Sequence, residues 1–247
     1  MHTLRALAVS ILSGGLFAGS AGPVAADWIT FPASPGEPLA RSGEDASGPS
    51  ANPVRGFLSI PVESGPHPAV VLLPACEGRR AFHQTWAQAL SGRGFMALLV
   101  DDFFMHDRYQ TCGISDPAER ADVLQRRVRN ALAAAHYLAA RADVDRERIA
   151  VMGWGDAPIG DLIAEVERAE PRYETFSAAV AVTPARCFDG DHAPARPLLV
   201  LLAASDPGRS EDRCKAPSEV SMVEVRVYEG TLPGFDDPQA GGGRAYG

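Results

Sequence analysis

Continuous apolar runs recur along this chain, and longer amphipathic segments separate them. The clearest runs cover residues 69–73 and 95–100, and each consists of aliphatic or aromatic side chains. Runs of this length and composition are typical of strands that are buried on both faces. The same reasoning predicts further strands at residues 28–31, 55–60, 148–152, 176–182, 198–203 and 222–228.

The segments between these runs carry apolar side chains at helical spacing. Phe82, Trp86 and Leu90 fall four residues apart and form one stripe, which predicts a helix packed against the sheet. A second helix is predicted to begin at Asp116, a favourable N-cap that precedes Pro117 at the first helical position. The side of this helix that is expected to face the sheet consists of Leu124, Val128, Leu132 and Ala135.

Strands that alternate with helices indicate an α/β fold, in which a mostly parallel central sheet carries helices on both faces. We assign this domain to residues 54–238, a length that supports a sizeable hydrophobic core. Residues 27–53 are expected to hold a short strand and an arm rich in Pro, Gly and Ser, and residues 239–247 a flexible tail.

The N-terminus has the features of a secretory signal peptide. Arg5 precedes a mostly apolar stretch at residues 6–18, and residues 24–26 offer small side chains for cleavage. We therefore predict that residues 1–26 are removed and that the mature protein is periplasmic or secreted, with no membrane contact after cleavage. No other stretch approaches the length of a membrane-spanning helix.

The charge pattern gives no support to a nucleic-acid partner. The chain has 23 basic and 31 acidic residues, a formal net charge of −8, and its arginines are scattered. The densest group, Arg126, Arg127 and Arg129, lies on the second predicted helix, where we interpret it as a solvated face. We therefore expect no nucleic-acid binding.

Four cysteines in an exported chain indicate two disulfides. Three pairings are possible from sequence alone, but Cys76–Cys112 and Cys187–Cys214 are favoured because each pair lies at the ends of predicted strands. The cysteines lie far apart and lack a CxxC pair, so we expect neither zinc nor another metal or cofactor. Acidic residues and a histidine at 101–107 offer ligands for a hard metal, although a solvated loop is the simpler interpretation.

Residues 153–157, Gly-Trp-Gly-Asp-Ala, carry the most informative local pattern. They follow the apolar run at 149–152 and precede an amphipathic segment that starts at Gly160, so a strand passes into a helix through small residues. This is the setting of the nucleophile elbow, G-x-S-x-G, whose central residue supplies the attacking atom. Here the central residue is Gly155, which has no side chain.

The chain resembles the dienelactone hydrolase family of the α/β-hydrolase superfamily. The segments that carry the resemblance are residues 72–78, 100–103, 152–154, 201–206, 228–230 and 234–236. The resemblance extends over the whole assigned domain and implies an α/β-hydrolase fold. It also implies hydrolysis of ester or lactone bonds wherever the family's catalytic residues are present.

The family's chemistry requires a nucleophile, an acid and a histidine in that chain order. Carried over to this chain, the acid is Asp206, the nucleophile position is Gly155 and the histidine position is Pro233. The last histidine of the chain is His192, which precedes Asp206, so no shift of the alignment restores the order. Two of the three catalytic groups are therefore missing.

The expected oxyanion-hole region is altered as well. Its two backbone donors would come from Asp156 and from the loop around Cys76. The Asp156 carboxylate would oppose a developing negative charge, and Pro74 in the second loop has no N–H to donate. Because an elbow holds its central residue in a strained conformation, we interpret Gly155 as relieving that strain once catalysis is not required.

Three functional hypotheses follow. We favour an exported, non-catalytic homologue that binds a small molecule or a periplasmic protein partner. The alternative is an active carboxylic-ester or lactone hydrolase with a relocated catalytic set. The third is a structural subunit, for which the arm at residues 33–53 is the only indication.

Overall fold

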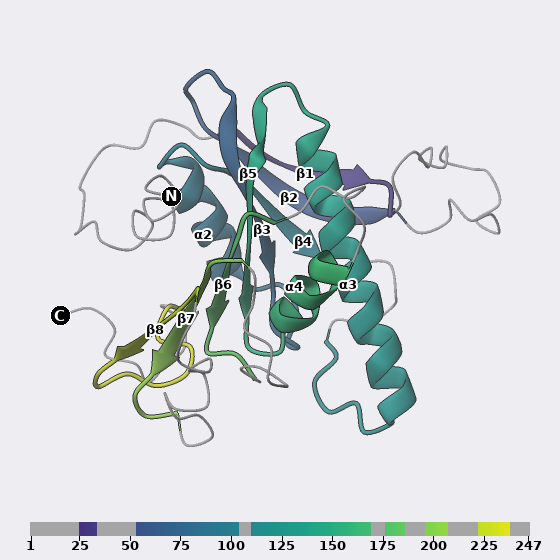
Figure 1. The fold of residues 1–247 in the computed structure, drawn as a ribbon, viewed down its shortest axis with the longest axis vertical. Coiled ribbons are helices and arrows are strands. Elements are labelled where there is room, and N and C mark those ends of the chain that lie inside the picture. Colours follow the sequence, from purple (N-terminus) through teal and green to yellow (C-terminus); the bar gives the residue numbers. More distant parts are fainter. Residues whose placement is uncertain are drawn as a thin grey trace.

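The computed structural model describes residues 25–33, 53–103, 110–168, 176–185, 196–206 and 222–237 (Figure 1). Its strands form one sheet in the order β1-β2-β4-β3-β5-β6-β7-β8. The strands are β1 (Ala25–Phe31), β2 (Val54–Ile60), β3 (His67–Leu73), β4 (Met96–Asp101), β5 (Val144–Trp154), β6 (Ala178–Val182), β7 (Leu198–Ala203) and β8 (Val223–Tyr228). All eight predicted strands are therefore present, with shifts of a few residues at their ends.

The sheet is mostly parallel, as predicted. Strands β3 to β8 pair with one another in parallel, whereas β2 is antiparallel to both β1 and β4. Every residue of β7 is buried, which agrees with its continuous apolar sequence. The carboxyl ends of the parallel strands lie at one edge, the edge at which open α/β sheets bind ligands.

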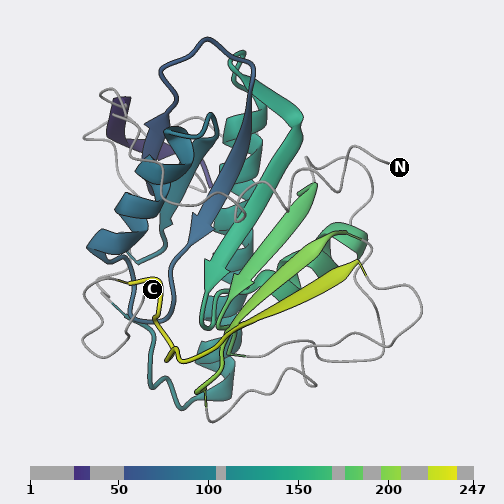
Figure 2. The same ribbon diagram turned by 90° about the vertical axis from the view of Figure 1, so that its left-hand side faces the viewer.

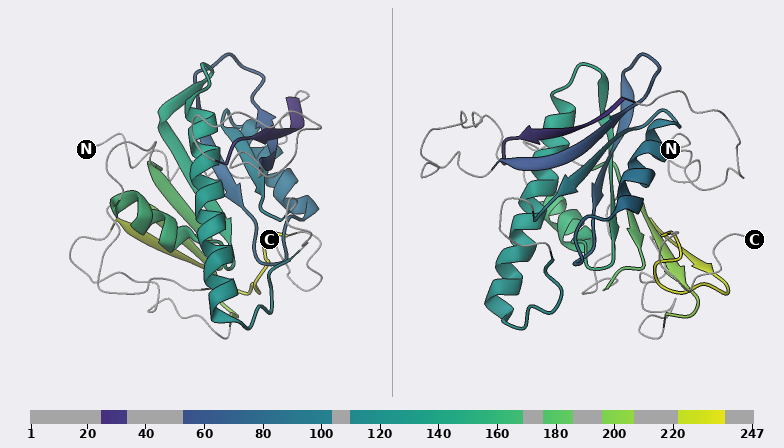
Figure 3. Two further views of the ribbon diagram at one scale, coloured as in Figure 1. Left: turned by 90° about the vertical axis from the view of Figure 1, so that its right-hand side faces the viewer. Right: turned by 180° about the vertical axis from the view of Figure 1, so that it is seen from behind.

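Helices cover both faces of the sheet, as Figure 2 and Figure 3 show. Helix α2 (Ala81–Ser91) packs on one face, and α3 (Pro117–Ala139) packs with α4 (Ile159–Arg168) on the other. Side chains alternate between the two layers along each strand: Val70 of β3 belongs to the α2 layer and Val71 to the α3–α4 layer. The domain therefore has one hydrophobic core on each side of the sheet.

Helix α3 begins as predicted but presents a different face to the sheet. The Asp116 side chain caps it by accepting a hydrogen bond from the Ala118 N–H at 3.0 Å. Leu124, Val128 and Leu132 of the predicted stripe are only half-buried. The buried residues are Val123, Arg127, Asn130, Ala131, Ala133, Ala134, Ala135 and Leu138. The buried face is thus displaced by about one residue, because Arg127, which was expected on a solvated face, is buried one helical turn from Val123 and from Ala131.

The first described strand lies at the edge of the sheet and pairs with β2 along its whole length. Residues 1–24 lie outside the described part of the chain, so the signal peptide stays a prediction, and a cut before Asp27 would fall inside β1. Residues 34–52 of the predicted arm and the predicted tail at 239–247 also lie outside it. Among the described helices, none is long and apolar enough to cross a membrane.

Candidate functional site

The three catalytic positions carried over from the family lie in loops at the carboxyl edge of the sheet. Gly155 follows β5, Asp206 follows β7 and Pro233 follows β8. A backbone hydrogen bond of 3.1 Å from the Ser205 N–H to the Thr231 carbonyl joins the last two loops. Asp206 is buried, whereas Pro233 is exposed. The fold therefore places the acid position beside the loop that would carry the histidine, but Pro233 supplies no base there.

Gly155 has the backbone of an elbow without the side chain. Its φ is +56°, in the left-handed region that glycine tolerates and other residues rarely adopt. A Cβ at this position would meet the Ala75 Cβ at 3.1 Å. Gly153 is needed for a different reason, because a Cβ there would lie 2.6 Å from the Ala157 Cβ. The positive φ supports the hypothesis that glycine relieves strain at residue 155.

The turn after β5 carries Asp156, whose N–H is a predicted oxyanion-hole donor. The residues on either side of Asp156 donate their N–H groups to backbone carbonyls, but the Asp156 N–H has no acceptor among the described residues. The Asp156 carboxylate lies 3.5 Å from the guanidinium of Arg127. The negative charge that was expected to oppose an oxyanion is therefore partly offset by a neighbouring cation.

Arg127 is the central polar residue of this edge, contrary to the prediction of a solvated helix face. Its side chain is 2% exposed. Nε donates to the Asp102 carboxylate at 3.0 Å, Nη1 donates to the Asp156 carbonyl at 3.3 Å, and Nη2 donates to the Pro74 carbonyl. One guanidinium thus ties together the chain segments that follow β3, β4 and β5.

Asp102 is buried against α3 and does not lie in the solvated loop that the sequence suggested. Its Oδ2 accepts from Arg127, and its Oδ1 accepts from the Asn130 side-chain amide at 3.1 Å. Burial raises the pKa of the Asp102 carboxyl, while the Arg127 charge and the two hydrogen bonds act in the opposite direction. Both oxygens are engaged within the protein. The residues at 104–107, which were weighed as hard-metal ligands with Asp102, lie outside the described chain.

A second buried carboxylate fixes the loop after β8 to the α2 face. The Trp154 Nε1–H donates to Asp236 Oδ2 at 2.5 Å. The next residue, Asp237, forms an ion pair of 2.9 Å with Arg80. Burial raises the pKa of the Asp236 carboxyl, against the effect of the hydrogen bond from Trp154. Residues of β5 and α2 therefore hold the loop that would carry a catalytic histidine.

His83 packs against Trp154, the donor to this second carboxylate, but does not replace the missing base. Its ring centroid lies 3.9 Å from that of Phe82 and 4.8 Å from that of Trp154, and the residue is 1% exposed. Nδ1 accepts the Arg80 N–H at 3.0 Å, so the neutral ring carries its proton on Nε2. Burial lowers the pKa of His83 to about 4. With Nδ1 engaged and Nε2 protonated, the ring has no nitrogen free to accept a proton.

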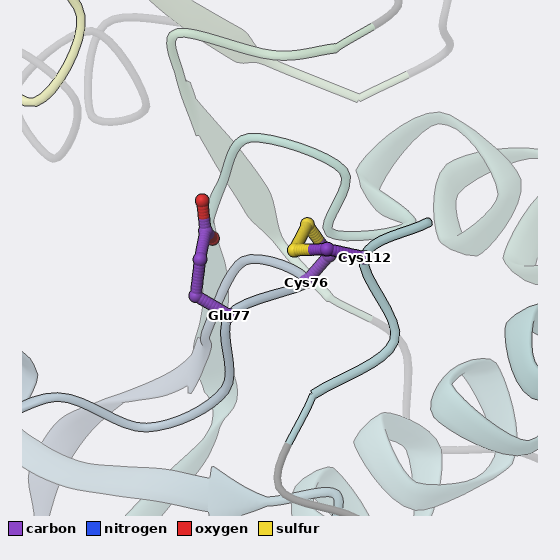
Figure 4. Close-up of side chains that lie close together, drawn as sticks. All are labelled: Cys76, Glu77 and Cys112. Atoms are coloured by element: carbon purple, nitrogen blue, oxygen red, sulfur yellow. A yellow bond between two sulfur atoms is a disulfide. The ribbon is translucent and has the colours of Figure 1, made fainter. Parts of the chain in front are cut away.

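Cys76 and Cys112 form the predicted disulfide, with their Cα atoms 4.9 Å apart. The bond joins the loop after β3 to the segment that leads into α3. Glu77 lies next to it, as Figure 4 shows, and its carboxylate and both sulfurs are within 4.8 Å of one another. Neither sulfur is a free thiol, so Cys76 is not a nucleophile in this state. Cys187 and Cys214 lie outside the described residues, and their pairing stays a prediction.

Comparison with known protein families tests the resemblance independently. The family model described as the dienelactone hydrolase family matches residues 54–243. The chain belongs to the dienelactone hydrolase family. This confirms the resemblance seen in the sequence and agrees with the observed sheet. No curated protein sequence matches the chain.

Solved structures share the α/β-hydrolase fold with this family member at low sequence identity. P91, a dienelactone hydrolase-like promiscuous phosphotriesterase from metagenomic libraries, is 20% identical, with a TM-score of 0.66 over 89% of this chain and 87% of that chain. A putative dienelactone hydrolase from Klebsiella pneumoniae is 16% identical, with a TM-score of 0.56 over 90% and 92% of the two chains. An esterase from Thermogutta terrifontis is 14% identical, with a TM-score of 0.54 over 81% and 85%. These likenesses establish the fold.

The polar residues that organise the carboxyl edge carry no local motif in this family member. Asp102 and Arg127 are 25 residues apart, and Trp154 and Asp236 are 82 residues apart. One signal was available, because Asp102 follows a strand that is almost entirely apolar, and a carboxylate in that place needs a partner inside the fold. The next helix offers four arginines as partners, Arg120, Arg126, Arg127 and Arg129, and the sequence does not distinguish among them.

Proposed function

We propose that this member of the dienelactone hydrolase family is an exported, non-catalytic homologue that binds a small molecule at the carboxyl edge of its sheet. The observation that carries the proposal is the turn at Gly155. It keeps the positive φ of an elbow, but its central residue has no atom that can attack an ester. Triad-dependent hydrolysis begins with such an atom, so a chain without it lacks the first chemical step.

The absence of a general base supports the proposal independently. No histidine follows Asp206 in the sequence, and Pro233 stands at the histidine position. Three histidines are described. His83 is engaged through Nδ1, and His67 lies at the amino end of β3, where Nε2 is 3.0 Å from the Glu63 carbonyl. His136 lies in the last turn of α3. Restoring hydrolysis would therefore require at least two new groups.

The groups that remain favour a neutral carbonyl compound as the ligand. The Asp156 N–H has no acceptor among the described residues, and no side-chain atom of Gly155 competes for it. The Asp156 carboxylate belongs to the same residue and disfavours an anion there, because the Arg127 guanidinium 3.5 Å away offsets its charge only partly. We expect an ester, lactone or amide to bind more tightly than the matching carboxylate.

Covalent labelling tests the loss of the nucleophile. Paraoxon phosphorylates esterase 2 of Thermogutta terrifontis. We expect the intact mass of the present protein to stay unchanged after the same treatment, and aryl-ester hydrolysis to match that of heat-denatured protein. A covalent adduct at any residue, or turnover that Asp206→Asn abolishes, would favour an active hydrolase with a relocated catalytic set and overturn the proposal.

Ligand binding is tested by thermal shift with matched pairs of neutral and ionised compounds. A lactone or ester is expected to raise the Tm, whereas the corresponding acid is not. The shift should shrink in Gly155→Ala, whose Cβ would stand beside Ala75. If the acid shifts the Tm as much as the ester does, the assignment of a neutral carbonyl ligand is wrong.

Export is tested by sequencing the N-terminus of protein recovered from the periplasmic fraction of a bacterial host. We expect the mature chain to begin at Asp27. Protein that keeps Met1 and stays in the cytoplasmic fraction would contradict export without affecting the proposal on catalysis.

A further inference from the structure

The loop after β3 and the segment before α3 bring three metal-ligating side chains together (Figure 4). The sulfurs of Cys76 and Cys112 and a carboxylate oxygen of Glu77 all lie within 4.8 Å of one another. Cys76 is half-buried and Glu77 is exposed, so solvent and solutes can approach the group. The two cysteines are 36 residues apart in sequence, and for that reason the search for a local CxxC pair does not reveal them.

We propose that reduction of the Cys76–Cys112 disulfide creates a site for one thiophilic divalent cation, such as Zn²⁺, held by both cysteines and Glu77. A dithiol reductant supplies two electrons: the S–S bond breaks, each protein sulfur gains a proton, and the reductant becomes a disulfide. The cation then displaces the two protons, and two thiolates and one carboxylate coordinate it. In the oxidised chain the sulfurs are bonded to each other, so the site exists only after reduction.

The donor set suits zinc better than a hard cation. Thiolates select soft and borderline metals, whereas Mg²⁺ and Ca²⁺ prefer oxygen ligands. Zinc takes four ligands at about 2.0–2.3 Å, so tetrahedral geometry places ligand atoms about 3–4 Å apart. The three atoms already lie within 4.8 Å, and rotation of the side chains is enough to bring them to this spacing. Water completes the coordination.

Backbone contacts hold the two segments together without the S–S bond. The Thr111 N–H donates to the Cys76 carbonyl at 2.8 Å, next to both cysteines. The Gly78 N–H donates to the Ala75 carbonyl at 2.9 Å and shapes the turn that carries Cys76 and Glu77. Reduction therefore leaves the three ligand-bearing residues close together, which lowers the entropic cost of forming the site.

The test uses the full chain with Cys187→Ser and Cys214→Ser, so that the remaining cysteines are those of the proposed site. The protein is reduced with dithiothreitol, desalted without oxygen and titrated with Co²⁺, a spectroscopic substitute for Zn²⁺. We expect one equivalent to bind with a sulfur-to-cobalt charge-transfer band, and Zn²⁺ to displace it. The oxidised protein should show no such band. No organic ligand is present, so the result is independent of the proposed binding of a carbonyl compound.

Variants in this background assign the ligands. Cys76→Ser is expected to abolish the charge-transfer band. Glu77→Gln is expected to weaken Co²⁺ binding by about tenfold or more, because it replaces a charged carboxylate ligand with a neutral amide. Glu63→Gln changes an exposed glutamate elsewhere and serves as the matched control, with unchanged affinity expected.

Three outcomes would overturn the proposal. The first is reduced protein that keeps its native circular dichroism but gives no charge-transfer band. The second is Glu77→Gln that binds Co²⁺ as tightly as its parent does. The third is reduced protein that loses its native circular dichroism and does not regain it with Zn²⁺, because the proposal requires the backbone to hold the ligands in place.

Discussion

Two buried carboxylates at the same edge of the sheet are held in opposite ways. On the α3–α4 face, Asp102 accepts hydrogen bonds from the Arg127 guanidinium and the Asn130 amide. On the α2 face, Asp236 accepts a hydrogen bond from Trp154, whose indole carries no charge. A cation therefore neutralises the first carboxylate inside the fold, while the second has a neutral donor.

This difference determines which interaction stabilises each of the two regions. The Arg127 and Asp102 side chains are 2% and 0% exposed, so removal of either partner would leave a buried charge unpaired. Oδ1 of Asp236 has no hydrogen-bond partner among the described residues, and burial raises the pKa of this carboxyl. The Asp102 side thus depends on charge pairing, whereas burial on the Asp236 side disfavours the charged form of the carboxyl.

Arg127→Met is expected to have the largest effect. It leaves the Asp102 carboxylate buried without its cation, which should lower the free energy of unfolding by about 3–5 kcal/mol. Urea unfolding measures this loss. Arg129→Met, at an exposed position of the same helix, is the control and should change stability by no more than about 0.5 kcal/mol.

Adding Asp102→Asn to Arg127→Met sharpens the same test. The double variant removes the unpaired charge, so it should be more stable than the single variant. If Arg127→Met alone costs less than about 1 kcal/mol, or if Asp102→Asn lowers stability further, the Asp102 side does not depend on charge pairing.

The next largest effect is expected in the pH dependence of the unfolding free energy, to which His83 contributes. Its pKa falls from 6.5 to about 4 on folding, so the unfolded chain binds more protons between these values. Stability therefore rises with pH here, and about 3 kcal/mol is lost between pH 6.5 and pH 4, at about 1.4 kcal/mol for each pKa unit.

The measurement compares the unfolding free energy of the parent with that of His83→Asn across this pH range. Asparagine can still accept the Arg80 N–H through its side-chain oxygen but does not titrate. The variant should lose stability at pH 7 and show a weaker dependence on pH. Parallel pH profiles for the two proteins would mean that His83 is not buried in its neutral form.

Asp236→Asn should raise stability at pH 7, whereas His83→Asn should lower it. Because the pKa of Asp236 is raised on folding from 3.8, this group stabilises the fold below pH 3.8, and the contribution is lost as pH rises through the folded-state value. The variant keeps an oxygen acceptor for Trp154 without the charge. We expect a gain of about 1 kcal/mol at pH 7 that disappears at low pH. Loss of stability at pH 7 would show that the charged form suits this site.

Gly155→Ala, which lies between the two regions, is expected to have an effect of similar size. A residue with a Cβ at φ +56° costs about 1–2 kcal/mol, and the Ala75 Cβ at 3.1 Å adds a tight contact. Gly94→Ala is the matched control, because Gly94 also has a positive φ but no described atom within 4 Å of its Cβ position. Urea unfolding should show a larger loss for Gly155→Ala. Equal losses in the two variants would mean that the positive φ alone, and not the contact with Ala75, destabilises Gly155→Ala.

The strands could be predicted from sequence because burial on both faces leaves a continuous local pattern. Every residue of β7 is buried, and its run of leucine, valine and alanine shows this directly. The buried face of α3 could not be predicted in the same way. Its second half is rich in alanine on several sides, and the partner of Arg127 is 25 residues away. A buried ion pair of this kind is a property of tertiary structure and has no periodicity.

In the candidate site, too, some features could be predicted from the sequence and others could not. Gly155, Asp206 and Pro233 are assigned from the family resemblance, and each follows a predicted strand whose end the sheet brings to one edge. The Cys76–Cys112 disulfide could be favoured because its cysteines also follow predicted strands. The hydrogen bond between Trp154 and Asp236 could not, since no local feature relates two residues that are 82 positions apart.

The long separation between Trp154 and Asp236 also constrains the order in which the molecule can be assembled. The ribosome must add 82 more residues after the tryptophan before the aspartate that receives its indole N–H exists. Until then, the Trp154 indole lacks its hydrogen-bond acceptor. The incomplete nascent chain also exposes apolar surface that chaperones can bind. Completion of the C-terminal segment is therefore the step that closes the domain.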